Sequence, residues 1–327
     1  MKLLIGLFSL TALSLVALVG CDRGASVAAS SPLTEVRLGF FPNITHAQAV
    51  LGVTTGDFAR AIGPIKFTPQ QFNAGPSLIE ALFAKQIDVG YVGPGPVINA
   101  FASSHGEGIR VIDGAAADGV LIVARKDSGI FTMTDLRGKK IATPQKRNTQ
   151  DVAARHFVTA VLGQSDANNV LPVSNADQFA MMQGGQIDAA WVPEPWGSLL
   201  IAQTGATLVG QEKDLWPDKQ FALTVIVTTP EFLEAHGDVV QKLLAVHRDW
   251  THRLNSNPAD CVPKLEEGLA GLTGGKLPAG VVADAISHVK FTEDPSPQTF
   301  STNAQWAFDL GFTKEKTDLT GLIVAPK

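Results

Sequence analysis

The chain has 327 residues, of which 45% are hydrophobic and 17% are charged. This composition is typical of a globular protein and excludes an intrinsically disordered chain. The formal net charge is −5, which excludes the basic surface on which most nucleic-acid-binding proteins depend. The length suits about two domains.

The N-terminus has the pattern of a targeting segment. Met1-Lys2 supplies one positive charge, and residues 3–20 are apolar or small and uncharged. A run of about 18 apolar residues can also span a bilayer, but its place at the N-terminus and the small residue at its end favour a signal peptide. We therefore predict a signal peptide over residues 1–20 and a flexible tether over residues 21–33.

The end of this segment, Leu18-Val19-Gly20-Cys21, resembles the bacterial lipobox, in which cleavage leaves a lipid-bearing cysteine as the first residue. We expect lipidation at Cys21 and a membrane anchor, because each buried CH₂ group contributes about 0.8 kcal/mol. Asp22, directly after the cysteine, indicates retention on the inner membrane. We expect the protein in the periplasm or at the cell surface. An ordinary signal peptide with a chance cysteine is the alternative. Cys261 is expected to be a lone buried thiol.

After the tether, predicted strands and helices alternate in two similar series. In the first series, a strand over 36–42 and a helix from Thr45 are followed by a helix after Ser77 and a strand over 86–92. In the second, a strand over 140–144 and a helix from Thr149 are followed by a helix after Asp177 and a strand over 186–192. Such alternation implies parallel sheets that helices cover on both faces.

The two series match at an offset of 100 residues. Residues 86–92 read Gln-Ile-Asp-Val-Gly-Tyr-Val and residues 186–192 read Gln-Ile-Asp-Ala-Ala-Trp-Val, so Tyr91 corresponds to Trp191. We predict an α/β protein of two lobes, each a mainly parallel sheet flanked by helices, with a ligand cleft between the lobes. Two ordinary βα units of one larger sheet are the alternative.

The chain is expected to cross between the lobes twice. Residues 119–124 and 221–229 are similar in length and β-branched character, and we interpret them as paired crossing segments. Lobe one is then expected to hold residues 34–124 and 224–327, and lobe two residues 125–223. Residues 231–254 have the apolar periodicity of a helix, and residues 278–312 are expected to pack against lobe one.

In sheets of this kind, ligands bind beyond the carboxyl ends of the strands. The loops at these ends carry aromatic, amide and hydroxyl side chains, and several run into helix N-termini, which bind anions. The predicted ligand-binding residues are Phe41, Asn43, His46, Asn73, Gly75, Tyr91, Gly93, Thr149, Gln150, Trp191 and Glu194. The alternatives are structural: turns for the glycines, core for the aromatic residues and a capping role for His46.

Glu194 lies between two prolines and beside two tryptophans. A carboxylate in such surroundings is costly unless it is paired. We expect it to pair with Lys146 or Arg147 across the cleft, or with an amine of the ligand. A solvated loop is the alternative for the two basic residues.

The sequence lacks the motifs of common enzymes. It has no Gly-x-Ser-x-Gly elbow and no His-Glu-x-x-His pair, and Ala270 replaces the first glycine that a P-loop ending at Lys276 would need. We therefore predict no catalytic residue, no metal site and no cofactor.

Several stretches resemble the nitrate-, sulfonate- and taurine-type substrate-binding proteins of ABC importers. The resemblance covers roughly residues 35–230 and is carried by residues 38–46, 72–77, 86–93, 148–151 and 191–196. It implies a type II periplasmic-binding-protein fold and a monomer that captures a small anion or zwitterion for delivery to permease subunits. It also implies ligand contacts at the positions named above, except Asn73 and Tyr91, which come from the loop pattern alone.

The resemblance has one departure. Lys146-Arg147 stands where a glycine-containing lead into Asn148 is expected, which changes the local charge. A cysteine-rich branch that binds pyrimidine precursors matches poorly, because the chain has no cysteine cluster. An enzyme on the same fold, such as one of pyrimidine-precursor synthesis, and a ligand-sensing module are the alternatives to a capture protein. A nucleophile or metal cluster would favour the first, and a fused signalling segment the second.

Overall fold

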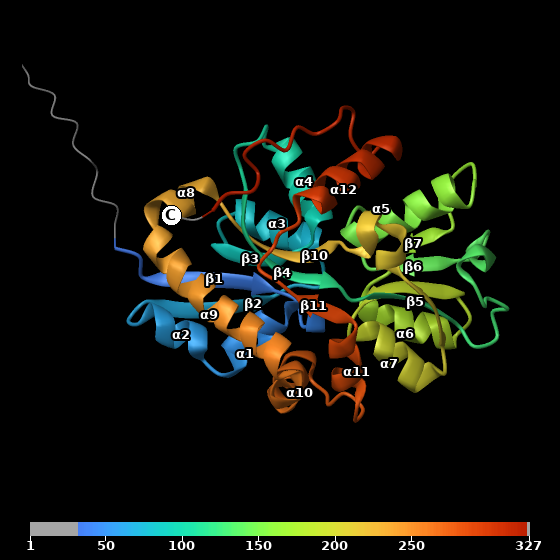
Figure 1. The fold of residues 1–327 in the computed structure, drawn as a ribbon, viewed down its shortest axis with the longest axis horizontal. Helices are drawn as coiled ribbons and strands as arrows, with labels where there is room; N and C mark the ends of the chain where they lie inside the picture. Colours follow the sequence, from blue (N-terminus) through green and yellow to red (C-terminus); the bar gives the residue numbers. More distant parts are fainter. Residues whose placement is uncertain (1–31, 326–327) are drawn as a thin grey trace, which may run out of the picture. The chain divides into compact units, whose positions relative to one another are not determined.

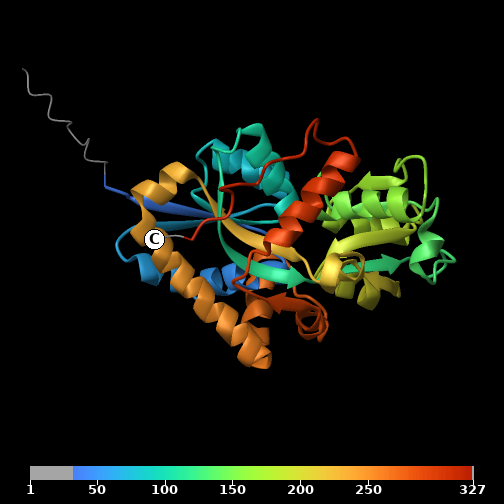
Figure 2. The same ribbon diagram turned by 45° about the horizontal axis from the view of Figure 1, so that its top comes forward.

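The computed structural model describes residues 32–325, and their strands form two separate sheets. The predicted signal peptide, the lipidation site at Cys21 and nearly all of the tether lie outside the described residues. Figures 1 and 2 show the two sheets with the helices that cover them.

The first sheet has six strands in the order β11-β4-β10-β3-β1-β2. Their bounds are β1 Glu35–Phe40, β2 Lys66–Gln71, β3 Val89–Val92, β4 Arg110–Asp118, β10 Ala222–Thr228 and β11 Val289–Phe291. This sheet and the helices that cover it are called lobe 1 below. The neighbours β2, β1 and β3 are parallel, whereas β10 runs antiparallel to β3 and β4.

The second sheet has five strands in the order β7-β6-β8-β5-β9, and with its helices it is called lobe 2. Its strands are β5 Val120–Ala124, β6 Ile141–Thr143, β7 Val170–Pro172, β8 Ala189–Pro193 and β9 Thr207–Gln211. Here β7, β6 and β8 are parallel and β5 is antiparallel to both of its neighbours. The sheets therefore repeat one arrangement, in which β3 corresponds to β8.

Helices cover both faces of each sheet (Figure 1). They are α1 Ala47–Thr54, α2 Asp57–Ile62, α3 Gly75–Phe83, α4 Pro94–Ser103, α5 Thr149–His156, α6 Asn175–Gln183, α7 Trp196–Thr204, α8 Pro230–Ala235, α9 Gly237–Ser256, α10 Pro258–Thr273, α11 Val281–Ser287 and α12 Pro297–Asp309. Within residues 32–325, none combines the length and apolarity that crossing a bilayer requires.

The expected α/β fold of two lobes is confirmed, with two differences in detail. Both sheets are mixed rather than mainly parallel, because the crossing strands enter without a crossover helix, which a parallel pair would need. Also, β5 belongs to the second sheet, although the sequence analysis assigned residues 119–124 to lobe one. The chain leaves the first sheet at Asp118 and turns at Gly119, whose φ of 76° suits glycine.

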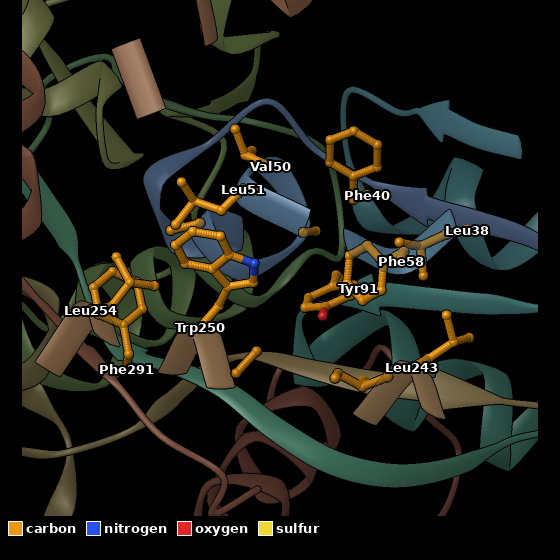
Figure 3. Close-up of a cluster of buried hydrophobic side chains, with 14 of the residues drawn as sticks. Leu38, Phe40, Val50, Leu51, Phe58, Tyr91, Leu243, Trp250, Leu254 and Phe291 are labelled. Carbon is orange, nitrogen blue, oxygen red and sulfur yellow. The ribbon is translucent and has the colours of Figure 1, made fainter. Parts of the chain in front are cut away.

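Each lobe has its own hydrophobic core. Figure 3 shows one cluster of lobe 1, in which Leu51 of α1 lies beside Trp250 of α9, and Leu38 of β1 lies beside Phe58 of α2. The apolar face predicted for residues 231–254 is buried here, although His236 divides the segment into α8 and α9. Cys261 is a free, buried thiol in the same core, as expected.

Helix α12 contacts both lobes, whereas the sequence predicted packing on lobe one alone. Phe300 and Ala304 near its start lie in a lobe 1 cluster with residues of α3 and α4. Trp306 and Ala307, one turn later, lie in the lobe 2 core, where the Trp306 ring stacks on His156 at 4.4 Å. Because apolar residues recur at helical spacing along α12, one face of this helix can pack against both lobes.

Candidate functional site

A cavity lies where the two lobes meet. Its volume is about 30 Å³, which suits a compact chemical group. Its lining is Phe41, Asn43, Thr45, His46, Asn73, Ala74, Gly75, Gly93, Pro96, Pro144, Asn148, Thr149, Gln150, Asn175, Pro193, Leu223 and Thr224. Most of the predicted ligand-binding residues are thus brought together: Phe41, Asn43, His46, Asn73, Gly75, Gly93, Thr149 and Gln150.

Helix N-termini from both lobes meet at this cavity. Gly75 begins α3 in lobe 1, while Thr149 begins α5 and Asn175 begins α6 in lobe 2. First-turn N–H groups have no partner within their helix, and the positive end of the helix dipole lies beside them. Helix α4 also starts here but adds little, because Pro94 and Pro96 have no N–H and the N–H of Gly95 is already donated to Thr149 Oγ1.

The loop before α5 is held in shape by one buried carboxylate. Asp151 accepts hydrogen bonds from Thr143 Oγ1 at 3.0 Å, from the Arg147 N–H at 2.8 Å and from Arg155 Nε at 2.9 Å. The Asn148 side chain in turn caps α5 by accepting the N–H of Asp151. These bonds fix the start of α5, so Thr149 and Gln150 face the cavity without a rearrangement of the loop.

His46 contributes a neutral donor. Burial lowers its pKa to about 3, so the ring is uncharged at neutral pH. Its Nδ1 accepts the N–H of Phe41 at 3.3 Å, which places the proton of the neutral ring on Nε2. The alternative for His46 was a capping role; it precedes α1 at the cap position, but its side chain makes no capping hydrogen bond, and its ring packs on Phe41 at 4.4 Å while lining the cavity.

Several hydrogen bonds join the lobes beside the cavity. Trp196 Nε1 of lobe 2 donates to Asn43 Oδ1 of lobe 1 at 2.9 Å, which leaves the NH₂ group of Asn43 as a donor. On the other side, Gly95 N donates to Thr149 Oγ1 at 3.2 Å. Thr149 can therefore still donate its hydroxyl proton to a ligand.

Tyr91 and Trp191 were predicted to contact the ligand, but neither lines the cavity. Both lie inside strands, so their side chains belong to the separate lobe cores. Tyr91 bonds His247 Nδ1 at 3.0 Å, and Trp191 Nε1 donates to Glu212 at 2.6 Å. The repeat correctly placed them at equivalent strands, but a large aromatic side chain there fills a core.

Glu194 was predicted to face the ligand or a basic residue of the loop, and the structure corrects this. The side chain is fully buried outside the cavity lining, where it accepts hydrogen bonds from Ser198 N at 3.0 Å and Ser198 Oγ at 2.7 Å. Its Oε1 lies 2.6 Å from His288 Nδ1 of lobe 1. The carboxylate is therefore satisfied by the protein itself.

Lys146 and Arg147 also stay out of the lining. Both are exposed, and the guanidinium of Arg147 lies 5.2 Å from the centre of the Phe312 ring. Arg147 has a φ of 66°, the left-handed region that favours glycine, which agrees with the glycine expected at this lead. The solvated-loop alternative describes them best.

Some lining residues were not among the predicted ligand contacts, although most of them lie in the strand-end loops that were expected to bind the ligand. Two could have been found from the repeat, because Asn175 corresponds to Gly75 and Pro193 to Gly93 at the same offset of 100. Thr224 lies on the crossing strand β10, where the pairing with β4 is irregular, and no sequence signal marks it. The others are Thr45, Ala74, Pro96, Pro144, Asn148 and Leu223.

The cavity has partly polar and partly apolar walls without formal charge. Among its described lining residues, none is Lys, Arg, Asp or Glu. Over residues 32–325, no group of three or more His, Cys, Asp or Glu side chains could hold a metal ion. The walls offer amide, hydroxyl and imidazole groups with backbone N–H groups, which is a donor-rich surface suited to the oxygens of an anion.

Two sequence relatives are named as binding proteins. The chain is 28% identical over 305 residues to the putative aliphatic sulfonates-binding protein of Bacillus subtilis (strain 168), covering 88% of this chain and 87% of the relative. It is 25% identical over 276 residues to the protein of that name from Escherichia coli (strain K12), covering 84% and 82%.

Among solved structures, the chain resembles the alkanesulfonate-binding protein SsuA from Xanthomonas axonopodis pv. citri bound to MOPS. The TM-score is 0.73 at 22% identity, and the match covers 89% of this chain and 98% of the other. This likeness supports the periplasmic-binding-protein fold expected from the sequence. The model of the NMT1-like family matches residues 29–261, which is most of the sequence, and the chain belongs to that family.

Proposed function

We propose that this chain captures a small anion, of the sulfonate or nitrate class, between its lobes and delivers it to the permease of an ABC importer. The observation that carries the proposal is the cavity at the meeting of the lobes, where α3 of one lobe and α5 and α6 of the other present their N-termini. A ligand that contacts both lobes stabilises the form in which they are closed.

The chemistry of the walls supports binding rather than catalysis. An anion here would accept hydrogen bonds from His46 Nε2, the amides of Asn43 and Gln150 and the hydroxyl of Thr149. The described lining has no carboxylate or cysteine to act as a base or nucleophile. We propose a non-enzymatic role, in keeping with relatives named as aliphatic sulfonate-binding proteins.

We also propose that the chain acts as a monomer anchored to a membrane by lipid on Cys21, in the periplasm or at the cell surface. Support comes from the lipobox-like sequence before Cys21. Producing cells fed an alkyne-bearing fatty acid should label the wild-type protein and leave C21S unlabelled. A C21S chain that is labelled and remains on membranes would contradict the anchor.

The binding proposal is tested by a thermal-shift screen of the processed chain, purified in mild detergent and freed of bound ligand, against sulfonates, nitrate, phosphate and neutral polar compounds. Ligand at 100 times its Kd stabilises a protein by about 2.7 kcal/mol. We expect a rise in Tm with a sulfonate or nitrate and none with the neutral compounds. No shift with any small anion, together with turnover of one of them, would contradict the proposal.

A further inference from the structure

Two buried polar atoms of the lining residues, Thr224 Oγ1 and Asn175 Oδ1, have no hydrogen-bond partner in the described structure. Thr224 is 1% exposed and Asn175 is 9% exposed. Both line the cavity, Thr224 from the crossing strand β10 and Asn175 from the start of α6. A buried polar atom without a partner is costly, so a bound ligand is the natural partner for both.

Both side chains can donate a hydrogen bond to an anion. A threonine hydroxyl donates one hydrogen bond, and rotating the asparagine amide by half a turn places its NH₂ group where the oxygen stands. With this rotation both side chains become donors, Thr224 in lobe 1, where His46 also lies, and Asn175 in lobe 2. The cavity then has donors from both lobes and the positive ends of three helices around it.

A cationic group finds no counter-charge in this cavity. The carboxylate that the sequence suggested for an amine, Glu194, is occupied by Ser198 and His288, and no other carboxylate stands in the described lining. Burying an ammonium group without a partner is strongly unfavourable. Helix N-termini around the site oppose a positive charge further.

From these observations, and resting on the proposed function, we infer that the cavity selects an anion without a cationic amino group, and that Thr224 is a specificity-determining donor to it. Simple alkanesulfonates and nitrate fit this description, whereas amino-sulfonates such as taurine do not.

The test compares two ligands of the same shape. 1-Propanesulfonate carries a methyl group where taurine, at neutral pH, carries an ammonium group. Calorimetric titration of the processed chain, freed of bound ligand, should give a Kd for 1-propanesulfonate at least about tenfold below that for taurine, because the ammonium lacks a partner. Nitrate, which has no amine, is titrated in parallel. Binding of nitrate alone would also support the inference.

A matched pair of variants tests Thr224. T224V removes the hydroxyl with little change of shape, and we expect about a tenfold rise in the Kd of the bound anion. Because that hydroxyl has no protein partner, the Tm of ligand-free T224V should equal or exceed that of the wild type, which a structural role would not allow. T224S keeps a hydroxyl and should bind within about threefold of the wild type.

The outcomes separate the two proposals. Taurine binding as tightly as 1-propanesulfonate, or T224V binding the anion like the wild type, would overturn this inference and leave the proposed function standing. If 1-propanesulfonate, taurine and nitrate all fail to bind, and no other anion shifts the Tm, the proposed function falls and this inference falls with it.

Discussion

At the scale of single residues, the two aromatic side chains of the repeat differ in their partners. Tyr91 of β3 is bonded to the neutral His247, whereas Trp191 of β8 is bonded to Glu212, which also accepts the indole N–H of Trp216 at 3.1 Å. Burial raises the pKa of Glu212 to about 8, although these two indole bonds act to lower it. Glu212 is therefore a protonated acid at neutral pH, in the core of lobe 2.

This acid makes stability depend on pH. Between about pH 4.5 and pH 8 the folded chain holds a proton at Glu212 that the unfolded chain has lost, so the free energy of unfolding falls as pH rises. The slope can reach about 1.4 kcal/mol per pH unit. E212Q keeps one oxygen that can accept one of the two indole N–H groups, and it has no such proton.

We predict that wild type loses stability relative to E212Q as pH rises from 5 to 8. Urea unfolding of both proteins at a series of pH values measures this difference. A difference that stays constant over that range would show that Glu212 is ionised in the folded chain.

At the scale of elements, close contact between the start of α4 and the start of α5 brings the lobes together. A Cβ atom added at Gly95 would lie 3.0 Å from Thr149 N and 3.1 Å from Asn148 C, both of them backbone atoms of the other lobe. Backbone cannot move aside as a flexible side chain can, so a methyl group at this position has to push the lobes apart.

We predict that G95A raises the Kd of the captured anion by roughly tenfold, the size of a moderate overpacking penalty. G271A is the matched control, since a Cβ there has nothing within 4 Å and alanine favours the helix α10. Titration calorimetry of both variants tests this. Equal weakening in the two, or none in G95A, would show that contact between the lobes does not govern affinity.

A second link between elements joins the end of β8 to the segment between α11 and β11. Glu194 of lobe 2 contacts His288 of lobe 1, and Ser198 Oγ contacts Asp284 Oδ2 at 2.8 Å. The hydrogen bond to Glu194 raises the pKa of His288; the charges of Glu194 and Asp284 add to the rise, whereas burial and Lys213 oppose it. The stabilisation is thus full below the ordinary histidine pKa of 6.5 and is lost as pH rises through the raised folded value.

We predict that wild type is more stable than H288Q at pH 6 and that this advantage shrinks toward pH 9. Thermal unfolding of the two proteins across this range gives the comparison. An advantage that grows with pH would mean that the link does not depend on a protonated His288.

At the scale of the whole molecule, the offset of 100 residues predicted two similar lobes, and the two sheets bear this out in β2-β1-β3 and β7-β6-β8. It also predicted which loops meet, because equivalent strand ends turn toward one cavity. The pattern could not tell an aromatic residue that fills a core from one that walls a cleft, as Tyr91 and Trp191 show.

Contacts between residues far apart in the chain could not be predicted from the sequence. Glu194 was correctly judged to need a partner, but that partner, His288, lies 94 residues away on the returning C-terminal segment. Thr224 stands on a strand whose residues are all buried and, apart from Thr228, otherwise apolar, and the pairing of β10 with β4 is irregular beside it. Local patterns carry information about elements, whereas such contacts depend on how the lobes fit together.

We propose that an anion is held between the lobes at the cavity lined by Asn43, His46, Thr149, Asn175 and Thr224. The most direct measurement is a crystal structure of the protein grown with 2-bromoethanesulfonate, in which anomalous scattering locates the bromine. We predict a bromine peak at the mouth of this cavity, with sulfonate oxygens within hydrogen-bond distance of groups from both lobes. A bromine peak beside one lobe alone, or at another surface, would show that the anion is held elsewhere.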